Sequence, residues 1–443
     1  METKRASWAS NLGFLMAAIG SAVGLGNIWG FPYKMGKSGG FAYLAVYALL
    51  AIFVGFIVMA SELAMGRKTG QGAMGTYHAL TKKFRWIGWL ALFSPFAVMG
   101  FYAVLGGYCI EYMALNLSNF AFGSESLATG GELFAALFLA LCYLINRSGI
   151  SGGIEKFNNV GMPTLFVMLV VIIIRSLTLP GAEAGVSFYL SPDPSKLEKT
   201  GLFPVINAAM NQAFFTLSVG IGAMCIFGSY QGKDRSLTGE AMWIMGLDTF
   251  VALMAGLIIF PACFAFGVEP GSGPGLVFVT LPNIFNVMAG GQLWGTLFFI
   301  FMSFAALSTV IAVFENIISY SADVWGMERR RATWLHAVGI WVCSLPCALG
   351  FNLLADFQPL GAGTCVLDLE DFLISNNILP LGGLFFLLFC CLRRGWGWDN
   401  FIAEVDQGVG MKFPRWLRGY VTYVLPCLII FVFVMGYVDK FWK

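Results

Sequence analysis

Two glycine-rich stretches interrupt apolar segments that otherwise have the length and composition of membrane-spanning helices. The first, residues 20–32 (GSAVGLGNIWGFP), holds four glycines and a proline, and the second, residues 214–223 (FFTLSVGIGA), holds two glycines. Each glycine costs a helix up to about 1 kcal/mol relative to alanine, so we expect both helices to break. A break frees backbone N–H groups, which suit a carboxylate, and carbonyl oxygens, which suit a small hard cation.

Other interpretations of the glycines are open at this point. Glycine clusters also let membrane helices pack closely. Gly24-Leu25-Gly26 begins like a nucleotide-binding loop, although no strand precedes it and the third glycine is missing. Unwound backbone at membrane depth is tolerated only where it is buried in protein or lines a cavity. Two breaks five spans apart therefore favour a transporter built from inverted repeats, with its site near the membrane centre.

The composition supports a membrane protein and argues against several other classes. Of the 443 residues, 58% are apolar and 11% are charged, against roughly a quarter charged in soluble proteins. The net charge of +2 argues against nucleic acid as a partner. Most of the ten cysteines lie in apolar runs, where a thiol acts as a small hydrophobe. Two histidines far apart in sequence suggest no metal cluster, and no nucleophile or paired catalytic acids suggest an enzyme.

We predict an all-α integral membrane protein with eleven transmembrane helices, because a helix needs about 20 mostly apolar residues to cross the bilayer. The expected spans are residues 9–33, 41–65, 87–117, 132–146, 158–178, 204–229, 241–267, 291–325, 333–350, 370–392 and 418–439, of which the fourth is the shortest. Residues 1–5 lack the apolar core of a signal peptide, so we expect no cleavage at this end.

The lysines and arginines of the loops predict the orientation. With the N-terminus in the cytoplasm, 19 of the 26 basic residues fall in cytoplasmic loops, among them the arginine run 329–331. We therefore expect a multi-pass protein of the plasma (inner) membrane, with a cytoplasmic N-terminus and a C-terminus outside.

The residues at the two breaks resemble those of one family, the neurotransmitter:sodium symporters, in its bacterial amino-acid branch. The resemblance is carried by residues 22–27 (AVGLGN), 215–218 (FTLS) and 308–309 (ST), by Tyr108, and by Lys4, Arg5 and Trp8. It extends through all eleven spans. It implies two inverted five-helix repeats, residues 1–178 and 204–392, with discontinuous first and sixth helices, and an additional helix at 418–439. Together they would form a single transmembrane domain, residues 1–443.

The resemblance also implies two sodium ions as co-substrates. The first would be bound by the Ala22 carbonyl, Asn27, Thr216, Asp248 and the substrate carboxylate. The second would be bound by the carbonyls of Gly20, Val23 and Ala305 and the hydroxyls of Ser308 and Thr309. Both sets contain only oxygen, as a hard cation requires. Taken alone, Ser308 and Thr309 would be interpreted as hydroxyls that bond back to the preceding helical turn.

Asp248 is the most informative acid, because a carboxylate within a span is costly and normally faces a cavity or a partner. Chloride-dependent members of the family have asparagine at this position and serine at the position of Ala252. Tyr47 and Gln212 remain from their chloride site. We hypothesise that Asp248 supplies the fixed negative charge that chloride supplies elsewhere. The alternative is a structural role as a cap or in a salt bridge.

The resemblance implies a substrate pocket as well. Its residues would be Ser21, Ala22, Leu25, Gly26, Val104, Tyr108, Phe215, Thr216, Ser218, Ile221, Thr309 and Val313. The amides of Leu25 and Gly26 and the Tyr108 hydroxyl would hold the substrate carboxylate. Monoamine carriers have aspartate where this chain has Gly24, so Gly24 favours an α-amino acid. The uncharged walls favour a neutral, apolar side chain, although Val104 and Val313 would be ordinary core residues without the family.

Two gates are implied by the same resemblance. The inner gate would consist of Arg5, Tyr230 and Asp323. At the outer gate the family has arginine where this chain has Gly30, while the acid, Asp371, is present. Lys34 lies one helical turn beyond Gly30 on the same face and is a candidate to replace the arginine. Phe215 and Tyr108 would form an aromatic lid.

These expectations describe a sodium-coupled symporter that imports a neutral, hydrophobic α-amino acid by alternating access and without chloride. Two alternatives remain open at this point. One is an ion- or proton-coupled carrier of another inverted-repeat family. The other is a membrane sensor or channel that binds an amino acid without accumulating it.

Overall fold

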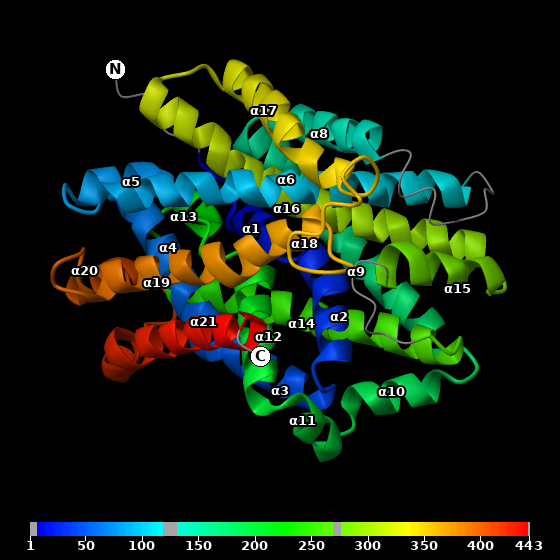
Figure 1. Ribbon diagram of the computed structural model, residues 1–443. Coiled ribbons are helices and arrows are strands. Elements are labelled where there is room, and N and C mark those ends of the chain that lie inside the picture. Colours follow the sequence, from blue (N-terminus) through cyan, green and yellow to red (C-terminus); the bar gives the residue numbers. More distant parts are fainter. Residues whose placement is uncertain (1–6, 118–130, 269–275, 442–443) are drawn as a thin grey trace.

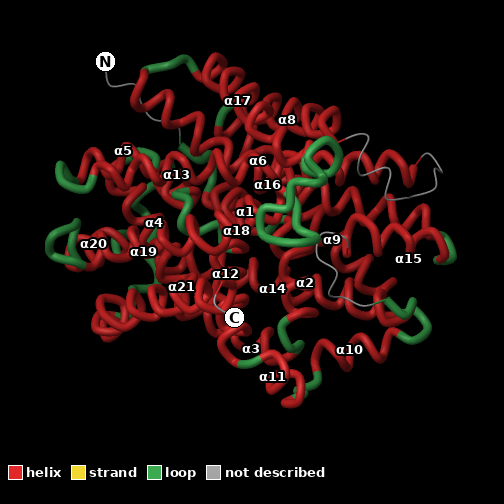
Figure 2. Tube along the Cα trace, in the orientation of Figure 1, coloured by secondary structure: helices red, strands yellow, loops and turns green. Residues whose placement is uncertain are grey.

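The computed structural model describes residues 7–117, 131–268 and 276–441, and their regular structure is helical. The α-helices are α1 (Asn11–Ala22), α2 (Phe31–Lys37), α3 (Phe41–Leu50), α4 (Phe56–Thr69), α5 (Ala73–Leu80), α6 (Arg85–Leu117), α8 (Gly131–Arg147), α9 (Lys156–Leu177), α10 (Ala182–Leu190), α11 (Pro194–Thr200), α12 (Leu202–Thr216), α13 (Ala223–Ser229), α14 (Leu237–Ala265), α15 (Leu281–Val287), α16 (Gly291–Trp325), α17 (Arg329–Leu349), α18 (Val366–Leu373), α19 (Leu379–Cys391), α20 (Trp398–Val405) and α21 (Leu425–Phe441). Short π-helical turns join α2 to α1 and α4 to α3, over Gly26–Gly30 and Ala51–Gly55. Figure 2 shows that the loops lie mainly at the ends of the helices.

Eight helices of the described residues are long and apolar enough to cross a membrane, and a ninth span results if the pair on either side of the first break, bent by 45°, is one span. The fourth predicted span is α8, which has 17 residues. The sixth is divided between α12, with 15 residues, and α13, with seven. The structure therefore contains both predicted interruptions, at the end of α1 and between α12 and α13. The predicted total of eleven spans includes α8 and the divided α12–α13.

The interrupted helices lie inside the bundle rather than at its surface. Figure 1 shows α1 and α13 in the middle of the molecule, and α1 packs against α9, α14 and α16. Beyond its break, the first segment contacts α14 and α12, and α13 packs along α4. The long helix α16 lies along α6. Both breaks are thus enclosed by continuous helices, the setting in which unwound backbone is tolerated at membrane depth.

Two ion pairs with buried acids fix helices at one end of the bundle. Arg67 at the end of α4 lies 2.8 Å from Glu404 of α20, with side chains 0% and 3% exposed, and its Nη1 donates to the Arg235 carbonyl at 2.7 Å. At the same end, Arg329 of α17 bonds to Glu315 of α16 at 3.0 Å. These arginines satisfy buried acids in addition to marking the topology, because an unpaired charge is costly inside a protein.

Removing Arg67 from its buried pair with Glu404 should destabilise the fold more than removing an exposed arginine. Arg67→Met leaves Glu404 buried without its cation, and we expect a loss of about 3 kcal/mol. The matched control is Arg331→Met, since Arg331 is 83% exposed and 3.9 Å from Glu328, and little change is expected. Thermal unfolding in detergent measures both variants, and equal shifts would contradict a stabilising role for the pair.

Candidate functional site

The two helix breaks face each other and are joined by side chains. Ser218 lies in the break after α12 with φ +50, in the left-handed region, and its hydroxyl donates to the Ser21 carbonyl at 2.9 Å. Gln212 of α12 donates from Nε2 to the Gly26 carbonyl at 2.7 Å. The Ser21 carbonyl at the first break is therefore satisfied by a side chain of the second break, and Gln212 adds a bond to the Gly26 carbonyl, which also accepts from the Phe31 amide.

Glu62 satisfies a backbone amide that the second break leaves without a helical partner. It is fully buried on α4, and its Oε1 accepts a hydrogen bond from the Gly220 amide at 2.5 Å, just before α13 begins. A carboxylate at this position satisfies a free amide and complements the positive end of a helix. The sequence shows that Glu62 lies in a span, but no residue pattern predicts the Gly220 amide as its partner.

The five residues expected at the second sodium site lie together between α1 and α16. The Ser308 hydroxyl is 2.9 Å from the Ala305 carbonyl and 3.4 Å from the Val23 carbonyl. The Thr309 hydroxyl is 3.4 Å from the carbonyls of both Gly20 and Val23. Calcium, also a hard cation, binds oxygen at about 2.3–2.6 Å, which places neighbouring ligands of an octahedron roughly 3.4 Å apart. The spacing here therefore fits a small hard cation held by these oxygens.

The side chains expected at the first sodium site, Asn27 and Thr216, are also brought together around Asp248 of α14. Asn27 donates from Nδ2 to Asp248 Oδ1 at 2.7 Å and to the Asp248 carbonyl at 3.0 Å. Thr216 lies beside this carboxylate, and its hydroxyl is 3.0 Å from that of Tyr47. Asp248 is fully buried, and its Oδ2 makes no hydrogen bond to the described residues. A buried carboxylate oxygen is costly without a partner, and a cation here would supply one.

The aromatic side of the site is formed by Tyr102 and Phe215, whose ring centroids are 6.0 Å apart. The Tyr102 hydroxyl lies at the backbone amides of Leu25 and Gly26. A Cβ at Gly24 would come within 2.3 Å of Thr309 Oγ1 and 3.0 Å of the Tyr102 hydroxyl, and one at Gly26 within 2.8 Å of the Phe215 ring. Only glycine lets this backbone approach the tyrosine, the threonine and the phenylalanine so closely.

The structure places Tyr108 and Val104 away from this site. Tyr108 packs its ring against Phe278 and Phe351, with centroids 5.8 and 5.7 Å apart. Val104 is buried on α6 two residues after Tyr102, and so lies about 200° around the helix from it. The sequence contains the spacing Val-x-x-x-Tyr twice, at Val98–Tyr102 and at Val104–Tyr108. The structure thus brings Tyr102, from the copy six residues earlier on α6, to the first break in place of the expected Tyr108.

The other expected pocket residues are buried in the surrounding core. Ala22 ends α1, and Ile221 lies in the second break, where its carbonyl accepts from Asn316 Nδ2 at 3.0 Å. Val313 follows Thr309 by one turn of α16 and is buried in the same apolar cluster. The Ser21 hydroxyl, in the same region, makes no hydrogen bond to any described residue.

The inner gate is only partly as expected. The Tyr230 hydroxyl donates to Glu315 at 2.8 Å, and Glu315 in turn pairs with Arg329. Asp323 is exposed near the end of α16, and Arg5 lies outside the described residues. The Glu315–Arg329 pair was not expected from the sequence, where Glu315 is one acid within a span and Arg329 one of several loop arginines.

At the outer gate, Lys34 lies beside the Phe215 ring, and the expected acid, Asp371, interacts electrostatically with it. Its Nζ is 5.8 Å from the centroid of the Phe215 ring, and Asp371 is the charge that acts on it. Asp371 accepts a hydrogen bond from the Ser375 hydroxyl at 2.7 Å. The neighbour of Gly30 is the Gln212 side chain. Lys34 therefore lies next to one aromatic wall of the site, one helical turn from Gly30.

Comparison with known proteins agrees with this geometry. The model of the sodium:neurotransmitter symporter family matches residues 5–124 and 119–441. The chain is 34% identical over 450 residues to YhdH, a sodium-dependent transporter of Bacillus subtilis, across 98% of each protein. It is 31% identical to a sodium-dependent transporter of Haemophilus influenzae, across 97% of this chain and 98% of the relative. The crystal structure of MhsT in complex with L-phenylalanine matches with a TM-score of 0.88 and 36% identity, across 97% of this chain and 99% of MhsT. The chain thus belongs to the sodium:neurotransmitter symporter family of multi-pass membrane transporters, and it is not an enzyme.

Proposed function

We propose that this symporter imports a neutral, hydrophobic α-amino acid by alternating access. The observation that carries the proposal is the Tyr102 hydroxyl at the amides of Leu25 and Gly26, where a substrate carboxylate would be bound. Gly24 leaves no acid for the amine of a substrate that lacks a carboxylate. The remaining wall of Ile221, Val313 and Phe215 is apolar. MhsT, the relative of known structure, was crystallised with L-phenylalanine, which is a molecule of this class.

Two sodium ions would accompany the substrate. The Asp248 group would bind one ion together with the substrate carboxylate, and the Ser308–Thr309 group would bind the other. One charge that moves through 100 mV supplies about 2.3 kcal/mol, so two ions supply about 4.6 kcal/mol before their concentration gradient is counted. At about 1.4 kcal/mol per tenfold, this concentrates a zwitterion by roughly a thousandfold.

The arrangement in the membrane follows from the same proposal. Eleven spans would place the N-terminus and the Arg67 and Arg329 pairs in the cytoplasm, and the C-terminus outside. Two five-helix repeats, residues 1–178 and 204–392, would move against each other around the central site. Tyr230, Asp323 and Arg5 would close the inner path, and Lys34 with Asp371 the outer one.

The primary test is uptake of a panel of radiolabelled amino acids into proteoliposomes, with and without an inward sodium gradient. Accumulation of an apolar amino acid that stops when choline replaces sodium is the expected result. Uptake that continues in choline would instead support a proton- or otherwise coupled carrier. Binding without accumulation would support a sensor.

Tyr102 and Tyr108 provide a matched pair of variants. Tyr102→Phe removes a hydroxyl from the substrate carboxylate, and we expect amino-acid binding to weaken about ten- to a hundredfold, the range for a hydrogen bond to a charged group. Tyr108→Phe should bind normally, because Tyr108 packs elsewhere. Equilibrium binding of the labelled amino acid at saturating sodium measures both. If Tyr108→Phe instead weakens binding more than Tyr102→Phe, the substrate carboxylate is bound by Tyr108.

Chloride dependence tests the charge of Asp248. Uptake by the natural protein should be unchanged when gluconate replaces chloride, because Asp248 already supplies the negative charge. Asp248→Asn should lose uptake in gluconate and regain part of it in chloride, while the control Glu328→Gln, an exposed acid, should behave like the natural protein. The hypothesis fails if natural uptake collapses without chloride, or if the Asn variant ignores chloride.

Lys34 is tested against Lys37, its neighbour at the end of the same short helix α2. Lys34→Gln should weaken substrate binding and speed substrate release, because the outer path loses its cation next to Phe215 and Asp371. Lys37→Gln should change neither. Stopped-flow release of substrate measures both variants. If Lys34→Gln releases substrate at the same rate as the natural protein, Lys34 is not part of the outer gate.

A further inference from the structure

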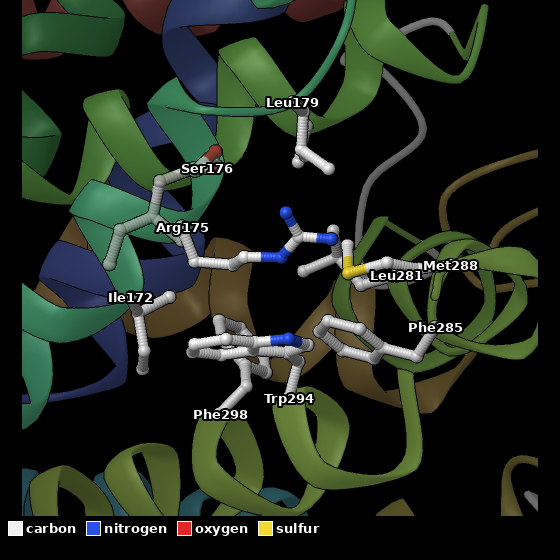
Figure 3. A pocket seen from close by; sticks show the side chains of 11 residues that line it. Ile172, Arg175, Ser176, Leu179, Leu281, Phe285, Met288, Trp294 and Phe298 are labelled. Atoms are coloured by element: carbon white, nitrogen blue, oxygen red, sulfur yellow. Dashed lines mark hydrogen bonds between the residues drawn. The ribbon is translucent and has the colours of Figure 1, made fainter. Parts of the chain in front are cut away.

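A pocket far from the central site contains an arginine for which the described residues supply no counter-ion. It lies where α9 and α14 end and α16 begins, and it encloses about 30 Å³, with further space open to the surroundings. Figure 3 shows the Arg175 side chain extending into the pocket, above the Trp294 ring. The guanidinium carbon is 5.5 Å from the centroid of that ring.

The guanidinium of Arg175 is poorly satisfied by the protein. No carboxylate among the described residues forms an ion pair with it, and its buried Nε makes no hydrogen bond within the described chain. The nearby Ser176 hydroxyl is already used, since it donates to the Ile258 carbonyl at 2.6 Å. A cation in apolar surroundings normally pairs with an anion, because desolvating it alone is costly. The pocket therefore has the charge to receive an anionic group.

The depth of the pocket distinguishes two levels. Arg175 and Trp294 both lie within four residues of the end of a membrane-spanning helix, at the height where tryptophan and arginine meet the lipid headgroups. One helical turn deeper, the pocket is closed by the apolar side chains of Ile172, Ile258 and Phe298, which are 7%, 3% and 1% exposed. The pocket therefore offers a positive charge at the membrane surface, above an apolar floor.

The surrounding helices face lipid. Exposed apolar side chains flank the pocket on α9, where Val171 and Ile174 are 39% and 58% exposed, and at the start of α16, where Leu293 is 68% exposed. Apolar side chains so exposed next to the opening indicate contact with acyl chains rather than with water. A membrane lipid therefore reaches the pocket directly.

We propose that this pocket binds the phosphate of one anionic phospholipid, which pairs with Arg175, while the acyl chain lies along the exposed side chains of Val171, Ile174 and Leu293. Arginine binds phosphate through paired charge-assisted hydrogen bonds. The site connects the ends of α9, α14 and α16, so the bound lipid stabilises their packing. The inference depends on the membrane location of the family and is independent of the proposed substrate.

The test uses the full-length protein purified in detergent and titrated with phosphatidylglycerol or phosphatidylcholine, with bound lipid counted by native mass spectrometry. The natural protein should retain phosphatidylglycerol in preference to phosphatidylcholine. Arg175→Gln should weaken retention of phosphatidylglycerol about tenfold, the loss expected for one charge-assisted contact. Arg175→Lys keeps the charge and should lose less. The matched control is Arg147→Gln, since Arg147 also lies over an aromatic ring, that of Tyr143, but outside this pocket.

A second variant tests the acyl chain separately from the charge. Ile174→Ser removes an exposed apolar side chain beside the opening and leaves Arg175 in place, and it should also reduce retention of phosphatidylglycerol. Unchanged thermal unfolding in phosphatidylcholine checks that each variant is folded. Equal retention by Arg175→Gln and Arg147→Gln would overturn the proposal. The proposal would also fail if inorganic phosphate displaces the lipid and Ile174→Ser has no effect, because that result describes a site for free anions.

Discussion

The structure depends on one constraint, which is that backbone polar groups released inside the membrane must find partners without water. Each unsatisfied N–H or C=O group in hydrocarbon costs several kcal/mol, so a helix cannot break there unless other groups replace its hydrogen bonds. Here the replacements come from Ser218 and Glu62, which bond to Ser21 and Gly220, and Gln212 adds a bond to the Gly26 carbonyl. The broken segments are held by particular side chains, and for that reason they have a defined geometry.

The same constraint explains why the oxygens of the site are concentrated in one place. Two breaks packed against each other expose carbonyls and amides to a shared interior, and α14 and α16 contribute Asp248, Ser308 and Thr309 around it. Continuous helices would direct none of these backbone groups towards the centre. Polar chemistry in the middle of an apolar bundle is therefore a product of the interruptions, with the unbroken helices α6, α9 and α16 as their rigid support.

Much of this could be predicted from the sequence, since glycine and proline at fixed positions in apolar runs have a local physical meaning. The breaks in the first and sixth segments followed from residue type and spacing. The Asp248 group and the Ser308–Thr309 group followed only from the resemblance to the symporter family, because Ser308 and Thr309 alone would be interpreted as hydroxyls bonded within their helix. Tyr102 could not be distinguished from Tyr108, because the sequence repeats the same Val-x-x-x-Tyr spacing and only packing decides which copy faces the breaks. The partners of Glu62 and Glu315 were likewise out of reach, since their contacts join residues 158 and 14 positions apart through tertiary packing.

The narrow space above Gly24 has a consequence for energy coupling. A Cβ there would contact both Thr309 Oγ1, in the group proposed to bind the second ion, and the Tyr102 hydroxyl, in the group proposed to bind the substrate carboxylate. In that proposal one α-carbon separates the two binding events, and an ion that orders Thr309 would restrict the same backbone that the substrate contacts. By thermodynamic reciprocity, if the ion raises the affinity for the substrate by some factor, the substrate raises the affinity for the ion by the same factor. Cooperativity between cargo and driving ion would then need no domain movement, only the absence of a methyl group at residue 24.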